Sequence, residues 1–123
     1  MVTKLLHKLK RRWFYKRMQQ REIYFILSTG RTGTNFMESF LNASSDDVFC
    51  VHEPQPDLFN ISIEKVREKK KNELIIANIQ EARRSILSDF VESGKNTFVE
   101  SNPFASFLVP ELRQVFPKAK FIF

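Results

Sequence analysis

A short segment of the chain has the residue types of an anion-binding loop, and its members are Ser28, Thr29, Gly30, Arg31, Thr32, Gly33, Thr34 and Asn35. The two glycines permit backbone conformations that turn consecutive N–H groups toward one anion. The hydroxyl and amide side chains add short polar donors. Arg31 adds a permanent charge that can stabilise negative charge developing on a leaving oxygen. The segment predicts a phosphate-binding loop, and a tight connection without a ligand is the alternative.

The flanking residues predict that this loop joins a strand to a helix. Residues 23–27 are a continuous apolar run with β-branched and aromatic side chains, typical of a buried strand in a parallel sheet. After the loop, Phe36, Met37, Phe40 and Leu41 recur at helical spacing. The N-terminus of such a helix offers free amides and the positive end of its dipole to a bound anion.

The loop differs from that of the nucleotide triphosphatases. Their motif, G-x-x-x-x-G-K-[ST], requires a lysine after the second glycine, and Thr34 follows Gly33 here. Without that lysine, or an evident acid for magnesium, we do not expect ATP hydrolysis. A phosphate-binding module or a small kinase relative remains an alternative.

Two polar residues after a second apolar run are candidates for proton transfer. Residues 48–51 predict a strand, and His52 and Glu53 follow it directly. In an open α/β sheet the loops beyond the carboxyl ends of the strands carry the ligand contacts. A neutral histidine or a carboxylate at that edge can accept a hydroxyl proton. We therefore name both as candidate catalytic and acceptor-binding residues. Capping of the strand is the alternative.

A third predicted strand, residues 97–100, ends in a further polar group. Glu100, Ser101 and Asn102 follow or close this strand and precede Pro103. They are candidates for binding an acceptor at the same edge, and a hydrogen-bonded turn is the alternative. Cys50 lies within the apolar 48–51 run and is interpreted as a small core residue.

The remaining elements complete an alternation of strands and helices. Residues 52–60 are predicted as a loop. Apolar residues recur at helical spacing in 62–71, 74–92 and 107–116, and residues 120–123 are predicted to begin a final strand. This order predicts an α/β domain with a mostly parallel sheet. Thirteen phenylalanines suggest either a core filled by rings without polar atoms or apolar surface that a missing partner segment would cover.

The N-terminal residues differ from the rest in charge, so the chain divides into a basic helix, 1–21, and a domain, 22–123. Residues 1–21 hold eight of the 20 Lys and Arg and no acid, and the remaining 12 basic residues accompany 14 acidic ones. Leu5, Leu6 and Trp13 recur at helical spacing within residues 3–20. The helix either lies on an anionic membrane surface or packs its apolar side chains on the domain.

Composition excludes several classes of protein. The body of the chain has a net charge near −2, which disfavours a nucleic-acid-binding domain. A single cysteine permits no intrachain disulfide, and no run is long enough for a membrane span or a signal peptide. We therefore expect a cytoplasmic protein. No cluster of metal ligands is evident, so no metal is predicted, and the oligomeric state stays open.

Residues 25–36 resemble the 5′-phosphosulfate-binding loop of sulfotransferases. That loop has a basic residue, Ser or Thr, Gly, two Ser or Thr residues and commonly an aromatic one. Arg31 matches the basic position and Phe36 the aromatic one, while Asn35 departs from the commoner Ser or Thr. A second match comes from residues 98–103 and 112–122, whose "FPKAKFI" strand is similar to a stretch of these enzymes.

The resemblance implies a three-layer domain like that of P-loop nucleotide triphosphatases, and transfer of a sulfuryl group from 3′-phosphoadenosine 5′-phosphosulfate (PAPS) to a hydroxyl or amine. Residues 28–36 would bind PAPS, and Arg31 would stabilise the leaving phosphate oxygen. The acceptor would be a small molecule or carbohydrate. In the family, an Arg-Asp-Pro-Arg-like segment that holds the 3′-phosphate follows this strand. The chain stops before it, so we expect a domain truncated at its C-terminus with weak or no turnover.

Overall fold

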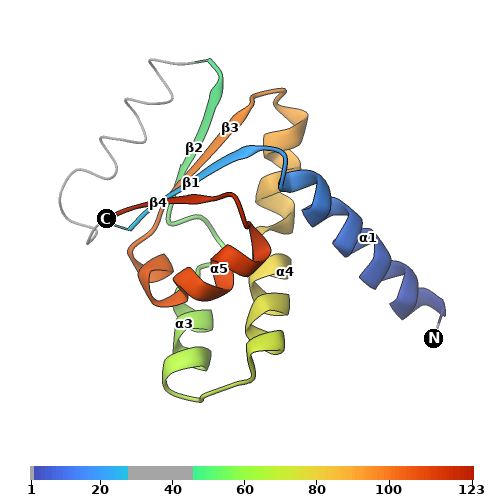
Figure 1. Cartoon of the computed structure of the whole chain (residues 1–123), viewed down its shortest axis with the longest axis vertical. Helices are drawn as coiled ribbons and strands as arrows, with labels where there is room; N and C mark the ends of the chain where they lie inside the picture. The colour runs from blue at the N-terminus through green and yellow to red at the C-terminus, as the bar shows by residue number, and fades with distance from the viewer. Residues whose placement is uncertain (1, 28–45) are drawn as a thin grey trace.

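The computed structural model describes residues 2–27 and 46–123 (Figure 1). Their helices and strands follow in the order α1 Val2–Met18, β1 Glu22–Ile26, β2 Val48–His52, α3 Phe59–Val66, α4 Asn72–Glu92, β3 Thr97–Ser101, the 3₁₀ helix η1 Pro103–Leu108, α5 Val109–Val115 and β4 Lys120–Ile122. Strands and helices alternate along the chain, which confirms the predicted α/β class.

The four strands form one sheet in the order β2-β3-β1-β4, and every pairing is parallel. Tyr24 of β1 lies opposite Val99 of β3, and Cys50 of β2 lies opposite the same residue. β1 and β3 are therefore interior strands, which explains their continuous apolar sequences. All four carboxyl ends lie at one edge of the sheet.

One face of the sheet packs against the helices. The main core joins alternate residues of the strands to α3, α4, η1 and α5, and phenylalanine rings make up much of it. Phe25 of β1 stacks on Phe121 of β4 with ring centres 5.5 Å apart, and Phe90 of α4 packs on Phe98 of β3. These contacts confirm the prediction of a ring-filled core, in which aromatic pairs add to the burial of their area.

A smaller apolar cluster lies on the other face of the sheet. Ile26, Cys50 and Val99 come from three neighbouring strands, and each is about 95% buried. The expectation that Cys50 is a core residue is confirmed. The same alternation puts the side chains of His52 and Ser101 on this face, because each lies two residues beyond a cluster member.

Two predicted boundaries were wrong. The helix predicted over 62–71 spans Phe59–Val66, so it begins inside the predicted loop. It ends early because Lys69 has a positive φ of 53° and the Lys70 N–H bonds the Glu64 carbonyl, which closes the helix terminus. The helix predicted over 107–116 is a 3₁₀ helix followed by α5. In this arrangement Phe107 is exposed rather than buried.

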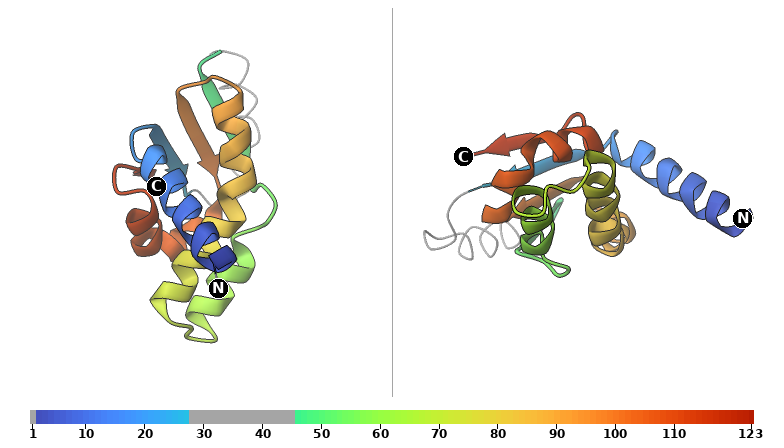
Figure 2. Two further views of the ribbon diagram at one scale, coloured as in Figure 1. Left: turned by 90° about the vertical axis from the view of Figure 1, so that its right-hand side faces the viewer. Right: turned by 90° about the horizontal axis from the view of Figure 1, so that it is seen from below.

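The N-terminal helix contacts the body mainly through its last turn, and its first turns project away from it (Figures 1 and 2). Tyr15 and Met18 are buried, and the Tyr15 hydroxyl donates a hydrogen bond to the Gln80 carbonyl of α4. Burial raises the pKa of the Tyr15 hydroxyl far above its ordinary value, which keeps it a donor. No described helix has both the length and the apolar character needed to cross a membrane.

The leucines and the tryptophan of α1 are not packed on the domain. Leu5, Leu6, Leu9 and Trp13 are all exposed, and Trp13 keeps 69% of its surface accessible. The interpretation in which this helix covers its leucines and tryptophan against the body is therefore wrong.

Candidate functional site

The predicted anion-binding loop and the residue after it, Ser28 to Phe36, lie outside the described residues, and this range includes Arg31. The elements that lead to it are described. β1 runs between β3 and β4, and backbone bonds hold its end: Leu27 N–H donates to Ile122 O at 2.8 Å, and Asn102 N–H donates to Ile26 O at 2.9 Å. The chain therefore leaves β1 at the edge where β3 and β4 also end.

The structure brings together His52, Glu53 and Ser101 at this edge. His52 Nδ1 lies 3.2 Å from Ser101 Oγ, and His52 Nε2 lies 3.2 Å from Glu53 Oε2. A serine hydroxyl can donate to Nδ1 or accept from it, depending on which ring nitrogen of His52 carries the proton. The three groups lie in a row from a buried serine, which is within hydrogen-bond distance of the imidazole, to a carboxylate that is close to the other ring nitrogen and 36% exposed.

The backbone at Glu53 is in an unusual conformation. Its φ is 42°, in the left-handed region that favours glycine, and its N–H donates to the Ser101 carbonyl at 2.8 Å. This bond continues the pairing of β2 with β3 one residue past the strand. Non-glycine residues in this region cost about 1–3 kcal/mol, and they cluster at functional sites. The conformation turns the chain so that the Glu53 side chain lies beside His52.

Glu100 has a different environment from these residues. It is fully buried on the helix-covered face, and Arg83 of α4 holds both its oxygens, with Nε 2.6 Å from Oε1 and Nη2 2.8 Å from Oε2. Arg83 Nη1 also donates to the Pro56 carbonyl at 2.6 Å. One guanidinium therefore joins α4, the loop after β2 and the end of β3, with the fork geometry that arginine offers to carboxylates.

Asn102 completes this buried cluster. Its amide donates to Glu100 Oε2 at 3.0 Å, and its carbonyl oxygen accepts from the Phe104 N–H at 3.1 Å, which caps η1. Both Asn102 and Ser101 are about 99% or more buried. Of the residues predicted to bind an acceptor, Glu100 and Asn102 therefore fix the shape of the edge, and His52 and Glu53 are the more accessible ones.

A comparison with models of protein families shows which family this fold belongs to. The model of the sulfotransferase family matches residues 24–123. The chain belongs to the sulfotransferase family. No curated protein and no solved structure gave a significant match.

Family membership assigns a sulfotransferase-type function, and it agrees with the resemblance inferred from the loop. The matched residues include the whole of the loop, the His52–Glu53 pair and the strand that ends the chain. They exclude all of α1, which contributes only its last turn to the packing of the sulfotransferase domain. The family match does not by itself assign roles to individual residues.

Arg83 is the member of this edge that sequence reasoning missed. It is 1% exposed and lies on the buried side of α4, four residues after Ile79 and four before Leu87. The sequence offered one signal for this pair: Arg83 occupies an apolar position in the helical pattern of residues 74–92, and Glu100 lies in a predicted buried strand. Among the described residues, no group of three or more His, Cys, Asp or Glu side chains could hold a metal.

Proposed function

We propose that this sulfotransferase transfers the sulfuryl group of PAPS to the hydroxyl or amine of a small-molecule or carbohydrate acceptor, at the carboxyl edge of the sheet. The observation that carries the proposal is the row of Ser101, His52 and Glu53, with neighbouring polar atoms 3.2 Å apart, at the carboxyl edge where β1 also ends. A proton acceptor and an anion-binding loop on adjacent strand ends are what group transfer to a hydroxyl needs.

The donor would be bound by residues 28–36. Backbone amides and hydroxyls of Thr32, Thr34 and Asn35 suit the phosphosulfate, and Arg31 carries the charge for the bridging oxygen. In the transfer, the acceptor oxygen forms a bond to sulfur while the bond between sulfur and the phosphate oxygen breaks. Adenosine 3′,5′-bisphosphate (PAP) leaves with the electron pair on that oxygen.

The acceptor's proton would go to the carboxylate of Glu53. Glu53 is the accessible end of the row, while both ring nitrogens of His52 already have a neighbouring polar atom at 3.2 Å. His52 then acts by holding the carboxylate in place, and Ser101 by holding the ring. With the proton on Glu53 and the charge on PAP, atoms and charge balance. Glu100, held by Arg83, and Asn102, bonded to Glu100, are fully buried and contribute by fixing the strand end.

Calorimetry with PAP tests the donor site. We expect Arg31→Ala to weaken PAP binding by about tenfold or more, because a charged hydrogen bond to phosphate is lost. The matched control is Arg67→Ala, which removes an exposed arginine beyond the end of α3. An excess of ATP should displace PAP poorly. ATP binding tighter than PAP binding would instead favour a nucleotide-binding module or kinase relative.

Sulfate transfer from radiolabelled PAPS to a panel of hydroxyl and amine acceptors tests the base. Turnover of the wild-type chain is expected to be weak, and Glu53→Gln should lower it to the uncatalysed background while PAP affinity stays unchanged. Glu68→Gln, at a half-exposed carboxylate of the α3–α4 loop, is the control. An unaltered rate in Glu53→Gln together with a large loss in His52→Asn would assign the proton to His52 instead.

A further inference from the structure

An apolar stripe runs along the exposed side of α1. Its members have exposed fractions between 45% and 72%: Val2, Leu5, Leu6, Leu9 and Trp13. At 3.6 residues per turn these five side chains fall within a sector about 100° wide. Single exposed apolar residues are ordinary, whereas five in one continuous stripe indicate a surface that binds something.

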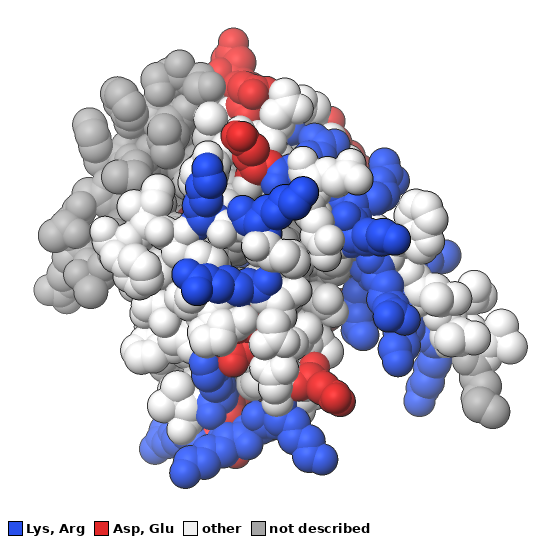
Figure 3. Space-filling view, viewed as in Figure 1, with Lys and Arg blue, Asp and Glu red and all other residues white. Residues whose placement is uncertain are grey.

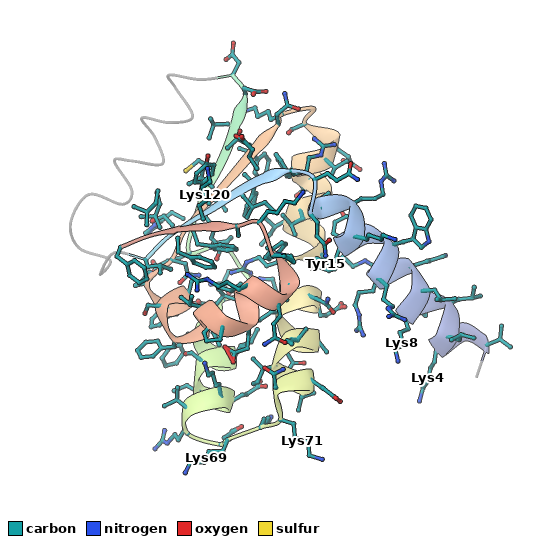
Figure 4. All side chains as sticks on the ribbon, viewed as in Figure 1. Lys4, Lys8, Tyr15, Lys69, Lys71 and Lys120 are labelled. Atoms are coloured by element: carbon teal, nitrogen blue, oxygen red, sulfur yellow. The ribbon has the colours of Figure 1, made fainter. Side chains whose placement is uncertain are left out.

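The stripe points away from the body because the opposite side of α1 is the one that packs. Phe14, Tyr15 and Met18 lie on that opposite side; Tyr15 and Met18 are 3% exposed, and Phe14 packs against the main core. The Tyr15 hydroxyl is bonded to α4, which fixes the rotation of the helix about its axis (Figure 4). The outward direction of the stripe is therefore set by packing in the last turn.

Basic side chains border the stripe on both sides. The helical period puts Arg12 along one border and Lys10 and Arg17 along the other, and Lys16 follows the stripe at its C-terminal end. Figure 3 shows Lys and Arg gathered over α1 with no acidic side chain among them. None of the ion pairs in the described part of the chain involves a side chain of α1.

We propose that α1 binds an anionic lipid bilayer, with the helix in the plane of the interface and the stripe inserted among the acyl chains. An apolar stripe bordered by Lys and Arg, with a tryptophan beside the leucines, is the pattern of helices that lie in this interface. A second copy would bring two helices of like charge together. A nucleic acid would match the charges but leave the stripe in water.

The position of α1 in the fold is compatible with this docking. The helix leads into the amino end of β1, whereas His52, Glu53 and the start of the predicted loop are at the carboxyl edge. These two ends are on opposite sides of the sheet (Figure 1). A bilayer under α1 therefore leaves the candidate site uncovered, and membrane binding can be measured independently of sulfate transfer.

Vesicle binding of the whole chain is the test. The probes are vesicles of phosphatidylcholine alone and of phosphatidylcholine with about 30% phosphatidylserine. Trp13 is the only tryptophan, so a blue shift of its emission and quenching by brominated acyl chains report insertion directly. We expect binding to the anionic vesicles with both signals, weakened at high salt by screening.

Two paired variants test whether binding depends on the stripe itself or on any exposed apolar residue. Leu5→Gln/Leu9→Gln keeps Trp13 and should bind at least about tenfold more weakly, because two apolar side chains no longer insert. Val66→Gln/Leu74→Gln removes two equally exposed apolar residues from the α3–α4 region and should bind like the wild type. Far-UV circular dichroism checks that all four substitutions leave the helices intact.

A second pair of variants separates charge beside the stripe from the net charge of the chain. Lys10→Gln/Arg12→Gln/Arg17→Gln removes three charges from the borders of the stripe and should weaken binding about 100-fold, which corresponds to about fivefold for each residue. Lys69→Gln/Lys70→Gln/Lys71→Gln removes three charges from the α3–α4 loop and should change binding less than threefold. Lys69 and Lys71 lie at the lower end of the body, between α3 and α4 (Figure 4).

Three results would overturn the proposal. Equal binding to both kinds of vesicle would show that anionic lipid makes no contribution, and equal losses in the two triple variants would show that α1 has no special role. A concentration-dependent dimer in sedimentation velocity that Leu5→Gln/Leu9→Gln abolishes, with no vesicle binding by the wild type, would show that a second copy covers the stripe.

Discussion

Two groups of charged residues in this protein have opposite surroundings. Arg83 and Glu100 are at most 1% exposed, and every polar contact they make is inside the domain. The basic residues of α1 are almost all exposed and have no acidic partner among the described residues. The first group gives the carboxyl edge its shape, and the second is available to something outside the chain.

The difference shows that charge alone does not indicate a function. Removing one partner of a buried pair leaves an uncompensated charge in the interior, which costs about 3–5 kcal/mol. Removing an exposed cation costs little, because water already solvates it. Substitutions in the two groups should therefore separate fold stability from surface binding.

The largest effect should come from Arg83→Met. Glu100 would remain buried with only the Asn102 amide, so we expect a loss of about 3–5 kcal/mol in the free energy of unfolding, measured in urea. Arg84→Met, at the next and partly exposed position, is the control. Adding Glu100→Leu to Arg83→Met should recover much of the loss. A change below about 1 kcal/mol in the single variant would contradict this account.

Asn102→Ala should have a smaller effect within the same cluster. It removes the amide bond to Glu100 and the cap of η1, for an expected loss of about 1–2 kcal/mol. Asn72→Ala removes an exposed amide whose bond to Gln114 is at the surface, and should cost under about 0.5 kcal/mol. Similar losses in the two variants would mean that burial does not strengthen the Asn102 contacts.

Tyr15→Phe tests the contact by which α1 is attached to α4. It should lower the free energy of unfolding by about 1 kcal/mol near pH 8, because the hydrogen bond to the Gln80 carbonyl is lost. The raised pKa predicts how this changes with pH. Above about pH 10 the unfolded chain loses the tyrosine proton while the folded chain keeps it, so wild-type stability falls as pH rises. The phenylalanine variant lacks this term. The difference between the two proteins should therefore shrink between pH 8 and pH 11, and a constant difference would argue against the burial of the hydroxyl.

The smallest effect on stability should come from Lys10→Gln/Arg12→Gln/Arg17→Gln. The three side chains are exposed, so the free energy of unfolding in urea should change by less than about 0.5 kcal/mol. The same triple is expected to lose most vesicle binding. A loss of stability above 1 kcal/mol would mean that these side chains contribute to the fold, and the contrast between the two groups would fail.

The strands and the longest helix could be predicted from the sequence because their patterns are local. Residues 23–27, 48–51 and 97–100 match β1, β2 and β3 to within a residue or two at each end. The end of α3 could not be predicted, since it depends on a left-handed lysine within a charged run. The exposure of Trp13 was also not predictable. Helical spacing shows that Trp13 and the leucines share one side of α1, but it does not show which side of α1 packs on the domain.

The candidate site was predictable only as a set of residues at one edge. The order of strands along the chain put His52, Glu53 and Ser101 together, and the structure adds the distances between them. The role of Glu100 depends on Arg83, 17 residues earlier in the chain. Such a pairing leaves no local pattern in the sequence, beyond two charges at positions where apolar residues are expected.

The two non-glycine residues of the described chain with positive φ differ in what a designer could change. Lys69 follows the end of a helix, where asparagine or glycine would adopt the same conformation with less strain, so substitution there should stabilise the protein. At Glu53 the same substitution would relax the backbone and also remove the carboxylate. Selection for thermal stability alone should therefore replace Glu53 readily, and under its proposed role as proton acceptor, keeping glutamate there costs stability.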